Sequence, residues 1–540
     1  MDLQNTTIII GGGSCAKKIA FDLLEKGISV TVVSSEENAG LCLSDFPKNT
    51  PVELLTQTRI IKCRGAVGNF TVSMDLNGKL IERNISNIVL AEEDRREPNF
   101  GLYGLTPSER ILSLSQVNDI INEPQRDDRI KSGFKTAFFA GLLRETDPVI
   151  TGQIMLLSLD LQSRFKNQVY ILTGNLKVAG DGLEALYRKT RDEGVVYIKF
   201  SNSLPSISQQ EDNRALIEFY DEITAEQFKF TPDITVVDEA IVPSEYLSEL
   251  TKVFKLGRDM AGFVQSDNVR RIPVYTNRKG ILVAGPSRTI QTRFDHDIDA
   301  ANAGLSVYGL LKDSAPVPEN RAEIDRGRCV RCLTCYRLCP FIAISLDAKP
   351  FVVGEACEGC GICAAECPKT TITIKGLSGP EISDRIVRPA DLGREKVFTP
   401  FIVAFCCNRS ASMARDLAVN NKLDMPKGLV TVELPCAGGI SLDHILHALR
   451  KGADGIMILT CHEGNCHSEK GNIYARRRAD SVLDLFDQMG LERQRLVVKT
   501  IASNMAMEFS ELLTKFEEQI IVLGVSKIAK TKDIGDDKTG

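Results

Sequence analysis

Residues 329–340 read Cys-Val-Arg-Cys-Leu-Thr-Cys-Tyr-Arg-Leu-Cys-Pro, and residues 357–368 read Cys-Glu-Gly-Cys-Gly-Ile-Cys-Ala-Ala-Glu-Cys-Pro. Both stretches have the spacing C-x2-C-x2-C-x3-C-P, so the segment is an internal repeat. Two-residue spacers allow a tight turn to aim three successive sulfurs at one centre, while the fourth cysteine ligates the other cluster. The repeat therefore predicts two [4Fe–4S] clusters that share their ligands across the two copies.

The spacing assigns four cysteines to each cluster. Cluster I is predicted to be held by Cys329, Cys332, Cys335 and Cys367, and cluster II by Cys357, Cys360, Cys363 and Cys339. A pair of zinc knuckles is the alternative, but zinc sites need neither the third cysteine, the fourth, nor the proline. The segment resembles bacterial two-[4Fe–4S] ferredoxins, which conduct single electrons and perform no bond chemistry alone.

The rest of the composition describes a multidomain globular chain. It has 540 residues, 16 cysteines and a net charge of −5, with no tryptophan. That charge gives no case for nucleic acid or an anionic membrane surface. No apolar run reaches the ~18–20 residues of a membrane-spanning helix, and the N-terminus lacks the features of a signal peptide. We expect a cytoplasmic protein without a direct membrane span, where structural disulfides are rare.

The N-terminal residues 7–34 are typical of a strand, a glycine turn, a helix and a second strand. Gly11, Gly13 and Ala16 satisfy G-x-G-x-x-A, and Ser14 lies inside the same turn. Such a turn lets a pyrophosphate approach the N-terminus of a helix. The acidic residue that should bind a ribose is replaced by Ser34. A Rossmann-like unit without a nucleotide is therefore the alternative hypothesis.

Several stretches in the first 375 residues are spaced as in the A subunit of heterodisulfide reductase. They are Gly11–Ala16, Asn99–Gly104, Tyr187–Lys189, Asp259–Phe263, Pro273 and Gly280–Gly285 with Pro286. The resemblance implies a thioredoxin-reductase-like FAD fold followed by ferredoxin clusters, with Gly285 and Pro286 closing over the flavin. One departure is that the Ala-Thr-Gly of the family is Ala91-Glu92-Glu93 here. FAD remains the expected cofactor, with altered contacts.

In the C-terminal part, cysteines follow three apolar strands. The strands are expected at 401–405, 429–434 and 455–460, followed by Cys406 and Cys407, by Cys436, and by Cys461 and Cys466. In a parallel sheet the carboxyl ends of the strands share one edge. The pattern therefore predicts that the thiolates meet there, in a geometry suited to an iron–sulfur site, with zinc as the alternative. We interpret the run 476–478, three arginines, as a solvated helix face.

Residues 398–520 resemble the delta subunit of methyl-viologen-reducing hydrogenase. The matching residues are Cys406–Asn408, Gly452–Gly455, Cys461-His462, Gly464, Cys466-His467 and Gly471-Asn472. The resemblance implies one [2Fe–2S] cluster. The third early cysteine of that family is Ser410 here. We expect Cys407, Cys436, Cys461 and Cys466 to be the ligands, with Cys406 as the substitute. We interpret His462 and His467 as structural polar residues, and the alternative is that they are ligands or donate hydrogen bonds to sulfur.

The sequence thus predicts an α/β chain in five segments. These are an FAD-binding domain of two α/β units (1–318), an α+β ferredoxin domain (319–377), a linker (378–397), a hydrogenase-delta-like α/β domain (398–522) and a disordered tail (523–540). The same order occurs in fused subunits of heterodisulfide reductase and in the B subunit of the quinone-interacting membrane-bound oxidoreductase.

The predicted function is electron transfer within a complex of this kind, as an oxidoreductase subunit that needs its partner subunits. Hydrogenase, formate dehydrogenase or adenylylsulfate reductase are the candidate electron partners. No catalytic acid, base or nucleophile stands out. A self-contained flavin-dependent reductase and a flavin-free docking scaffold are the alternatives.

Overall fold

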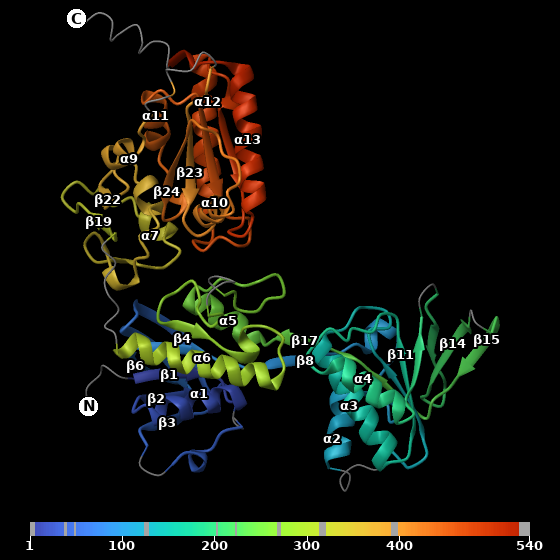
Figure 1. Ribbon diagram of the computed structural model, residues 1–540. Helices are drawn as coiled ribbons and strands as arrows, with labels where there is room; N and C mark the ends of the chain where they lie inside the picture. The colour runs from blue at the N-terminus through green and yellow to red at the C-terminus, as the bar shows by residue number, and fades with distance from the viewer. Residues whose placement is uncertain are drawn as a thin grey trace, which may run out of the picture.

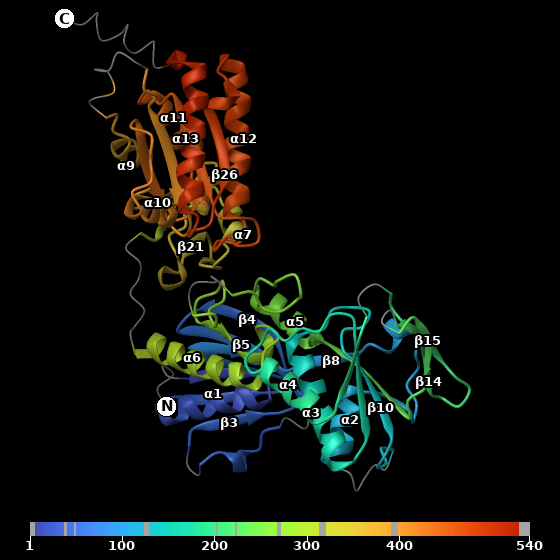
Figure 2. The same cartoon turned by 45° about the vertical axis from the view of Figure 1, so that its right-hand side comes forward.

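The computed structural model describes residues 6–36, 40–47, 50–123, 129–200, 203–221, 224–266, 272–312, 320–389, 392 and 398–528. The chain forms three bodies (Figures 1 and 2). A first α/β unit contains the N-terminus, a second α/β unit lies beside it, and the C-terminal half forms a third body on the first unit. Within the described residues, no helix is both long and apolar enough to cross a bilayer.

The first unit is built on a parallel sheet with the order β18-β7-β1-β2-β3. Its strands are β18 (Ile281–Val283), β7 (Asn87–Leu90), β1 (Thr6–Ile10), β2 (Ser29–Val33) and β3 (Val52–Leu55). Helices α1 (Ser14–Glu25) and α6 (Arg293–Lys312) pack on one face, and an antiparallel meander with helix α5 (Glu245–Phe254) covers the other. The meander strands are β4 (Thr58–Ala66), β5 (Asn69–Leu76) and β6 (Lys79–Ile85).

The second unit interrupts the first. Its parallel sheet has the order β12-β11-β10-β16-β9. The strands are β12 (Val196–Lys199), β11 (Gln168–Thr173), β10 (Lys135–Phe139), β16 (Ile234–Val237) and β9 (Ile111–Ser113), with helices α2 (Leu114–Asn122), α3 (Pro148–Arg164) and α4 (Leu183–Asp192). An antiparallel meander completes the unit: β13 (Ser206–Gln209), β14 (Ala215–Asp221) and β15 (Glu226–Phe230).

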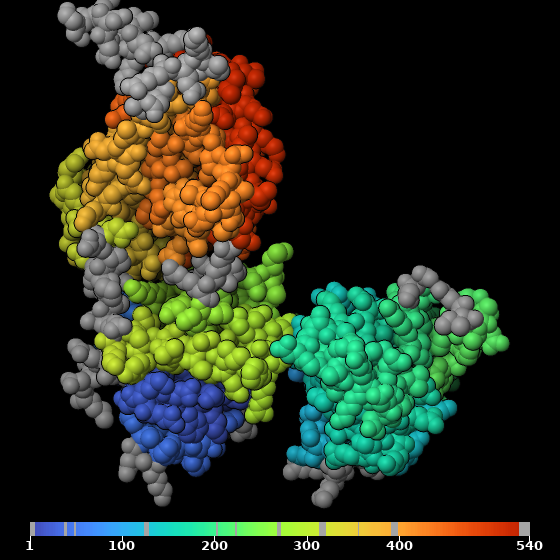
Figure 3. Space-filling model, in the orientation of Figure 1, coloured from blue at the N-terminus to red at the C-terminus, as the bar shows by residue number. Residues whose placement is uncertain are grey.

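The two units are joined by one antiparallel strand pair. Strand β8 (Asp94–Pro98) leaves the first unit and β17 (Glu239–Pro243) returns to it, and the two strands pair along their full length. The space-filling view shows the resulting narrow waist between two lobes (Figure 3).

The ferredoxin module, residues 320–377, is small and pseudo-symmetric. Two antiparallel strand pairs, β19 (Ala322–Ile324) with β22 (Ile372–Ile374) and β20 (Ile344–Leu346) with β21 (Pro350–Val352), flank two short helices. The helices are α7 (Thr334–Leu338) and α8 (Ile362–Ala365), one in each copy of the cysteine repeat. Each copy of the repeat thus supplies one helix and its preceding turn to the shared interior.

The C-terminal domain has a parallel sheet with the order β24-β23-β25-β26. The strands are β24 (Leu429–Leu434), β23 (Ile402–Cys407), β25 (Gly455–Thr460) and β26 (Leu496–Thr500). One face packs against α10 (Ala411–Asn420) and α13 (Ala506–Leu523), and the other against α11 (Leu442–Arg450) and α12 (Gly471–Met489). The expected mixed α/β fold class is confirmed.

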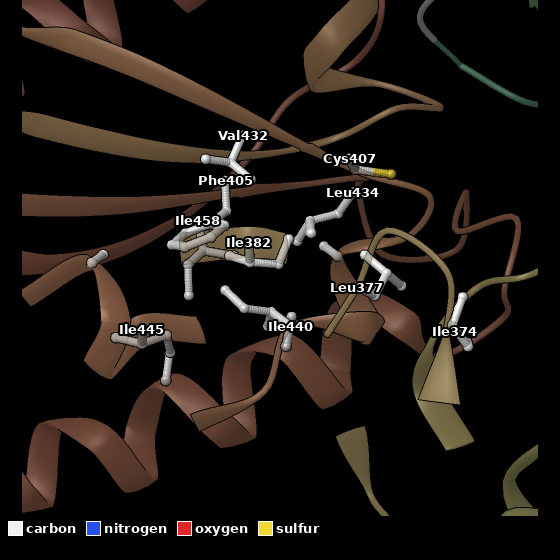
Figure 4. Packing of buried hydrophobic residues seen from close by; sticks show 14 of the residues in the cluster. Ile374, Leu377, Ile382, Phe405, Cys407, Val432, Leu434, Ile440, Ile445 and Ile458 are labelled. Carbon is white, nitrogen blue, oxygen red and sulfur yellow. The ribbon is translucent and has the colours of Figure 1, made fainter. Parts of the chain in front are cut away.

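The ferredoxin module and the C-terminal domain share one hydrophobic core. Ile374 and Leu377 of the ferredoxin module belong to the same hydrophobic cluster as Phe405 and Leu434 of the C-terminal sheet (Figure 4). Part of the predicted linker belongs to this core, because residues 379–385 form helix α9 (Gly379–Arg385), with Ile382 fully buried. The polar composition predicted an irregular linker there. The segment nevertheless packs on the shared core, because Ile382 in the helix and Ile386 after it are both buried. Of the predicted tail, α13 includes Leu523, and residues 529–540 lie outside the described residues.

Candidate iron–sulfur centres and the glycine turn

The eight ferredoxin cysteines line two separate pockets. One pocket is lined by Cys329, Cys332, Cys335 and Cys367, and the other by Cys339, Cys357, Cys360 and Cys363. Each pocket therefore combines three cysteines of one repeat with the fourth cysteine of the other. The thiols and the apolar side chains around them suit a cubane cluster, so the residues present fit the group.

Local backbone conformation explains how the sulfurs converge. Leu333 and Gly361 have positive φ angles of 61° and 85° and begin helices α7 and α8. Backbone N–H groups also point at sulfur: Ala322 N lies 3.3 Å from Cys357 Sγ, and Ala343 N lies 3.3 Å from Cys339 Sγ. Hydrogen bonds of this type are one of the features that set the reduction potential of a cluster.

The C-terminal sheet brings four further cysteines together at one edge. Cys407 Sγ and Cys461 Sγ are 3.6 Å apart, and hydrogen bonds also link Cys466 with Cys436 and with Cys461. These are the four cysteines predicted as ligands from the sequence. They come from the ends of β23, β24 and β25, as expected for parallel strands whose carboxyl ends share an edge.

Strand alternation separates Cys406 from this set. Successive side chains of a strand point to opposite faces of the sheet. Cys407 faces the ferredoxin module, whereas Cys406 is buried in the core formed with α10 and α13. This placement favours Cys407 over Cys406 as the fourth ligand.

A glycine makes room for the sulfurs. A Cβ atom on Gly471, the first residue of α12, would lie 2.4 Å from Cys436 Sγ and 3.3 Å from Cys466 Sγ. The next residue, Asn472, donates a side-chain hydrogen bond to the carbonyl oxygen of Cys461. The N-terminus of α12 therefore packs directly over the cysteine set.

The four thiols are close enough to perturb one another. Hydrogen bonds from neighbouring thiols lower the pKa of Cys407 and of Cys466, and the same contacts raise the pKa of Cys436 and of Cys461. Because thiolates are the form that binds metal, the donor chemistry fits an iron–sulfur cluster.

The polar neighbours of this set have other contacts. His462 Nδ1 lies 2.9 Å from Thr500 Oγ1, and the His467 ring packs against Phe341 of the ferredoxin module with 5.3 Å between ring centroids. The buried Ser410 hydroxyl lies beside Cys407 and Cys461, so a cysteine at position 410 would join the set.

The second ferredoxin pocket and the C-terminal cysteines are neighbours through glycine backbone. A Cβ on Gly439 would lie 2.7 Å from the carbonyl oxygen of Cys360, and one on Gly361 would lie 2.8 Å from the Cα of Gly439. Cys360 is also close enough to raise the pKa of Cys436. No side chain separates the two loops at this point.

Arg478 stabilises the contact between the ferredoxin module and the 438–439 loop. Its guanidinium forms a 2.9 Å ion pair with Glu366 of the ferredoxin module and donates to the carbonyl oxygen of Gly438. The interpretation of run 476–478 as a solvated face is therefore wrong for Arg478, which is only 6% exposed. Residues 476 and 477 are exposed, as expected.

One amide joins all three modules. The Asn277 side chain of the first unit donates to Pro340 O in the ferredoxin module (3.3 Å) and to Glu469 Oε1 in the C-terminal domain (2.6 Å). Gln265 adds a 2.7 Å hydrogen bond to Gly464 O. In both ribbon views the ferredoxin module, with α7, lies above the first unit, consistent with these contacts (Figures 1 and 2).

A chamber of about 800 Å³ lies between the first unit and the C-terminal domain. Arg288, Thr289 and Gln265 line one side, and Cys461, Cys466 and His462 line the other. The C-terminal cysteine set therefore has one side open to this chamber. Arg288 follows Gly285 by three residues, so the predicted cofactor edge of the first unit faces the same space.

The glycine turn predicted to bind FAD has the expected backbone. Gly11 has a φ of 137°, and a Cβ there would lie 2.0 Å from Ala91 O, so only glycine fits. A Cβ on Gly13 would lie 1.4 Å from Glu93 Oε1. The space above this turn, where a pyrophosphate approaches in dinucleotide-binding units, is therefore filled by a carboxylate. With Glu93 in this position, a bound dinucleotide would have to displace its side chain.

The other residues predicted to bind FAD lie around this turn. Ser34 is buried, and its Oγ accepts a hydrogen bond from the Glu36 N–H. Ser14 is exposed at the start of α1, and Ala16 is buried beneath it. Gly285 and Pro286 are buried, and a Cβ on Gly285 would lie 2.7 Å from Cys15 Sγ.

Sequence reasoning missed the residues that connect the modules. The glycines at 438, 439 and 471, Arg478 and Asn277 carry no ligand atom, and only their neighbours in space show their roles. The Gly471-Asn472 pair stood out only as a match to a family. Glu93 was visible as a departure from Ala-Thr-Gly, which was the available signal for its position.

Comparison with known proteins identifies two parts. The family described as "Methyl-viologen-reducing hydrogenase, delta subunit" matches residues 402–524, and "4Fe-4S dicluster domain" matches 321–368. The iron-sulfur D subunit of the F420-non-reducing hydrogenase of Archaeoglobus profundus is 33% identical over 131 residues, which cover 24% of this chain and 96% of that protein.

The larger part is similar to heterodisulfide reductase. The A subunit of the ferredoxin:CoB-CoM heterodisulfide reductase of Methanosarcina mazei is 26% identical over 355 residues, 65% of this chain. The match spans only 44% of that relative. Thioredoxin reductase of T. acidophilum superposes with a TM-score of 0.39 and 13% identity, covering 56% of this chain and 97% of that one.

The predicted order of the two resemblances is confirmed along one polypeptide. Through its C-terminal domain, the chain belongs to the family of the methyl-viologen-reducing hydrogenase delta subunit, fused here to a region that is similar to the A subunit of heterodisulfide reductase and contains a 4Fe-4S dicluster domain.

Proposed function

We propose that this chain is an electron-transfer subunit of an oxidoreductase complex of the heterodisulfide reductase or quinone-interacting type. The observation that carries the proposal is the backbone contact between Cys360 and Gly439, which brings the second ferredoxin pocket against the C-terminal cysteines. With iron–sulfur clusters bound, the three cysteine sets would supply sites for single electrons in a continuous series.

The cysteines have named roles in this proposal. The two [4Fe–4S] clusters would be held by the two sets of ferredoxin cysteines, and one [2Fe–2S] cluster by Cys407, Cys436, Cys461 and Cys466. The N–H groups of Ala322 and Ala343 donate hydrogen bonds to the sulfurs of Cys357 and Cys339, the kind of contact that sets the potential of a bound cluster. Gly471 and Asn472 place the start of α12 over the C-terminal set and limit access of water from that side.

The partners would be other redox subunits. The relatives are named as subunits of a heterodisulfide reductase and of a hydrogenase, so a subunit of a similar complex is the partner class that we propose. Hydrogenase, formate dehydrogenase and adenylylsulfate reductase are the candidate electron partners. The open side of the C-terminal set, on the chamber lined by Cys461 and Cys466, offers such a partner or a small redox carrier a way to approach.

Cofactor content tests the proposal directly. Anaerobically purified full-length protein should contain about 10 iron and about 10 acid-labile sulfide per chain, because two cubanes hold eight of each and one [2Fe–2S] cluster holds two. Electron paramagnetic resonance of the reduced sample should resolve both cluster types. About eight iron, or zinc at the C-terminal set, would refute the three-cluster series.

A further inference from the structure

The glycine turn of the first unit is filled by a side chain of the chain itself. Three atoms of Glu93 lie within 2.9 Å of the position that a Cβ on Gly13 would take, and its Oε1 is the closest at 1.4 Å. Gly13 is the residue that precedes α1. In a strand–turn–helix unit, this is where the helix N-terminus and the glycine backbone receive a phosphate.

The surroundings add further negative charge. Glu92 is buried next to Glu93, and Asp94 follows. Removal of the carboxyl group from water, followed by the charges of Asp94 and Glu36, raises the pKa of Glu93 to about 7. A diphosphate would therefore meet an occupied position beside several carboxyl groups, and those that are ionised would repel it in the same direction as the steric conflict.

Neighbouring contacts fix the backbone of the two residues that precede Glu93. Ser287, in the segment after Gly285, donates a 3.1 Å hydrogen bond to the carbonyl oxygen of Glu92. The Gly11 backbone packs directly on Ala91. Residues 91 and 92 are thus fixed between the glycine turn and the 285–287 segment. The side chain of residue 93 starts beside the turn, whichever rotamer it adopts.

We propose that Glu93 is an internal competitor for the phosphate position of the glycine turn, so that this chain binds FAD far more weakly than the same chain with glycine at position 93. A carboxylate at the N-terminus of a helix replaces the anion that a dinucleotide would otherwise place there. To bind, FAD must displace the Glu93 side chain and tolerate Glu92 and Asp94. This competition concerns the flavin alone and does not depend on the cluster series proposed above.

The test measures FAD affinity on the full-length, cluster-loaded protein after removal of any flavin. Equilibrium dialysis or calorimetry would compare the wild type with Glu93→Gly and with Glu93→Gln, which keeps the bulk of the side chain but removes its charge. Glu109→Gln, an exposed glutamate of the second unit, is the matched control. Iron content and thermal unfolding of each variant would verify that the fold is intact.

The expected ranking is specific. Glu93→Gly should bind FAD about tenfold tighter than the wild type or more, a difference that corresponds to ~1.4 kcal/mol. Glu93→Gln should lie between the two, and Glu109→Gln should equal the wild type. Equal affinity of the wild type and Glu93→Gly would overturn the proposal. Absence of FAD binding in every variant would also overturn it, because another feature would then exclude the flavin. A low iron content with the expected FAD ranking would count against the cluster series only.

Discussion

At two places in this molecule, a glycine at the start of a helix lies against the edge of a parallel sheet. The chemical group that occupies the space beside the glycine differs between the two places. At Gly471, at the start of α12, the space holds the sulfurs of Cys436 and Cys466. At Gly13, before α1, it holds the carboxylate of Glu93. The backbone geometry is of the same kind in both places. The residues that follow the neighbouring strands, Cys436 after β24 and Glu93 after β7, decide whether the sheet edge presents metal-binding thiols or a carboxylate that opposes an anion.

The largest effect should come from removing a thiol at the α12 edge. Cys461→Ser should lose the C-terminal cluster, so that iron falls from about 10 to about 8 per chain. Cys406→Ser is the matched control, since Cys406 faces the other side of the sheet and should keep all of the iron. Iron and sulfide analysis with electron paramagnetic resonance would distinguish them. Equal losses in both variants would contradict the assignment of Cys407 as a ligand.

A matched pair of alanines would test the two glycine edges against each other. Gly471→Ala should destabilise the C-terminal domain by about 2 kcal/mol, because its Cβ would overlap a buried sulfur. Gly13→Ala should cost under about 1 kcal/mol, since Gly13 has an ordinary φ of −91° and the flexible end of Glu93 can move away. Thermal unfolding of the anaerobic proteins would measure both. A larger loss for Gly13→Ala would show that the carboxylate is held rigidly.

The contact between the ferredoxin module and the α12 edge should depend on Arg478. Arg478→Met removes a buried guanidinium that joins Glu366 to the Gly438 carbonyl, and should reduce stability by about 2 kcal/mol. Arg476→Met on the exposed face of the same helix is the control and should be neutral within about 0.5 kcal/mol. Chemical denaturation would compare the two variants. Equal midpoints would mean that Arg478 contributes nothing to the contact.

A smaller effect than that of Arg478→Met is expected at the junction with the first unit. Asn277→Ala removes the hydrogen bonds to Pro340 O and Glu469 and should weaken the junction by about 1–2 kcal/mol. The C-terminal half should then separate more readily from the first unit, which small-angle X-ray scattering would detect as a larger radius of gyration. Asn175→Ala in the second unit, whose amide contacts Glu145, is the control. An unchanged scattering curve would mean that the other contacts, such as the hydrogen bond from Gln265 to Gly464 O, hold the junction together without Asn277.

The cysteine pattern was the most informative part of the sequence. Spacing alone predicted that three cysteines of one repeat join the fourth of the other, and each ferredoxin pocket has that lining. The expectation that three parallel strands deliver thiols to one edge rested on strand order. The structure brings Cys407 and Cys461 together in this way. Such patterns are readable because ligand geometry restricts local spacing.

Other features depended on contacts between distant residues. The choice between Cys406 and Cys407 needed the face of the sheet that each side chain occupies, and α9 needed the core in which Ile382 is buried. The burial of Arg478 depends on a glutamate 112 positions away. The sequence showed that Ala91-Glu92-Glu93 replaces the Ala-Thr-Gly of the family and that Ser34 replaces the acidic residue expected to bind a ribose. It did not show that the Glu93 side chain lies over Gly13.

The sequence by itself determined the chemistry. It indicated which cysteines form each ligand set, which strands precede them, and which glycines form the turn after the first strand. Short-range spacing and side-chain type suffice for that, because ligand geometry and backbone sterics act over a few residues. Only the tertiary structure decided that Cys360 lies against Gly439, that Asn277 joins three modules, and that Glu93 covers Gly13. These contacts arise from the packing of separate modules, and no local pattern in the chain encodes the distance between them.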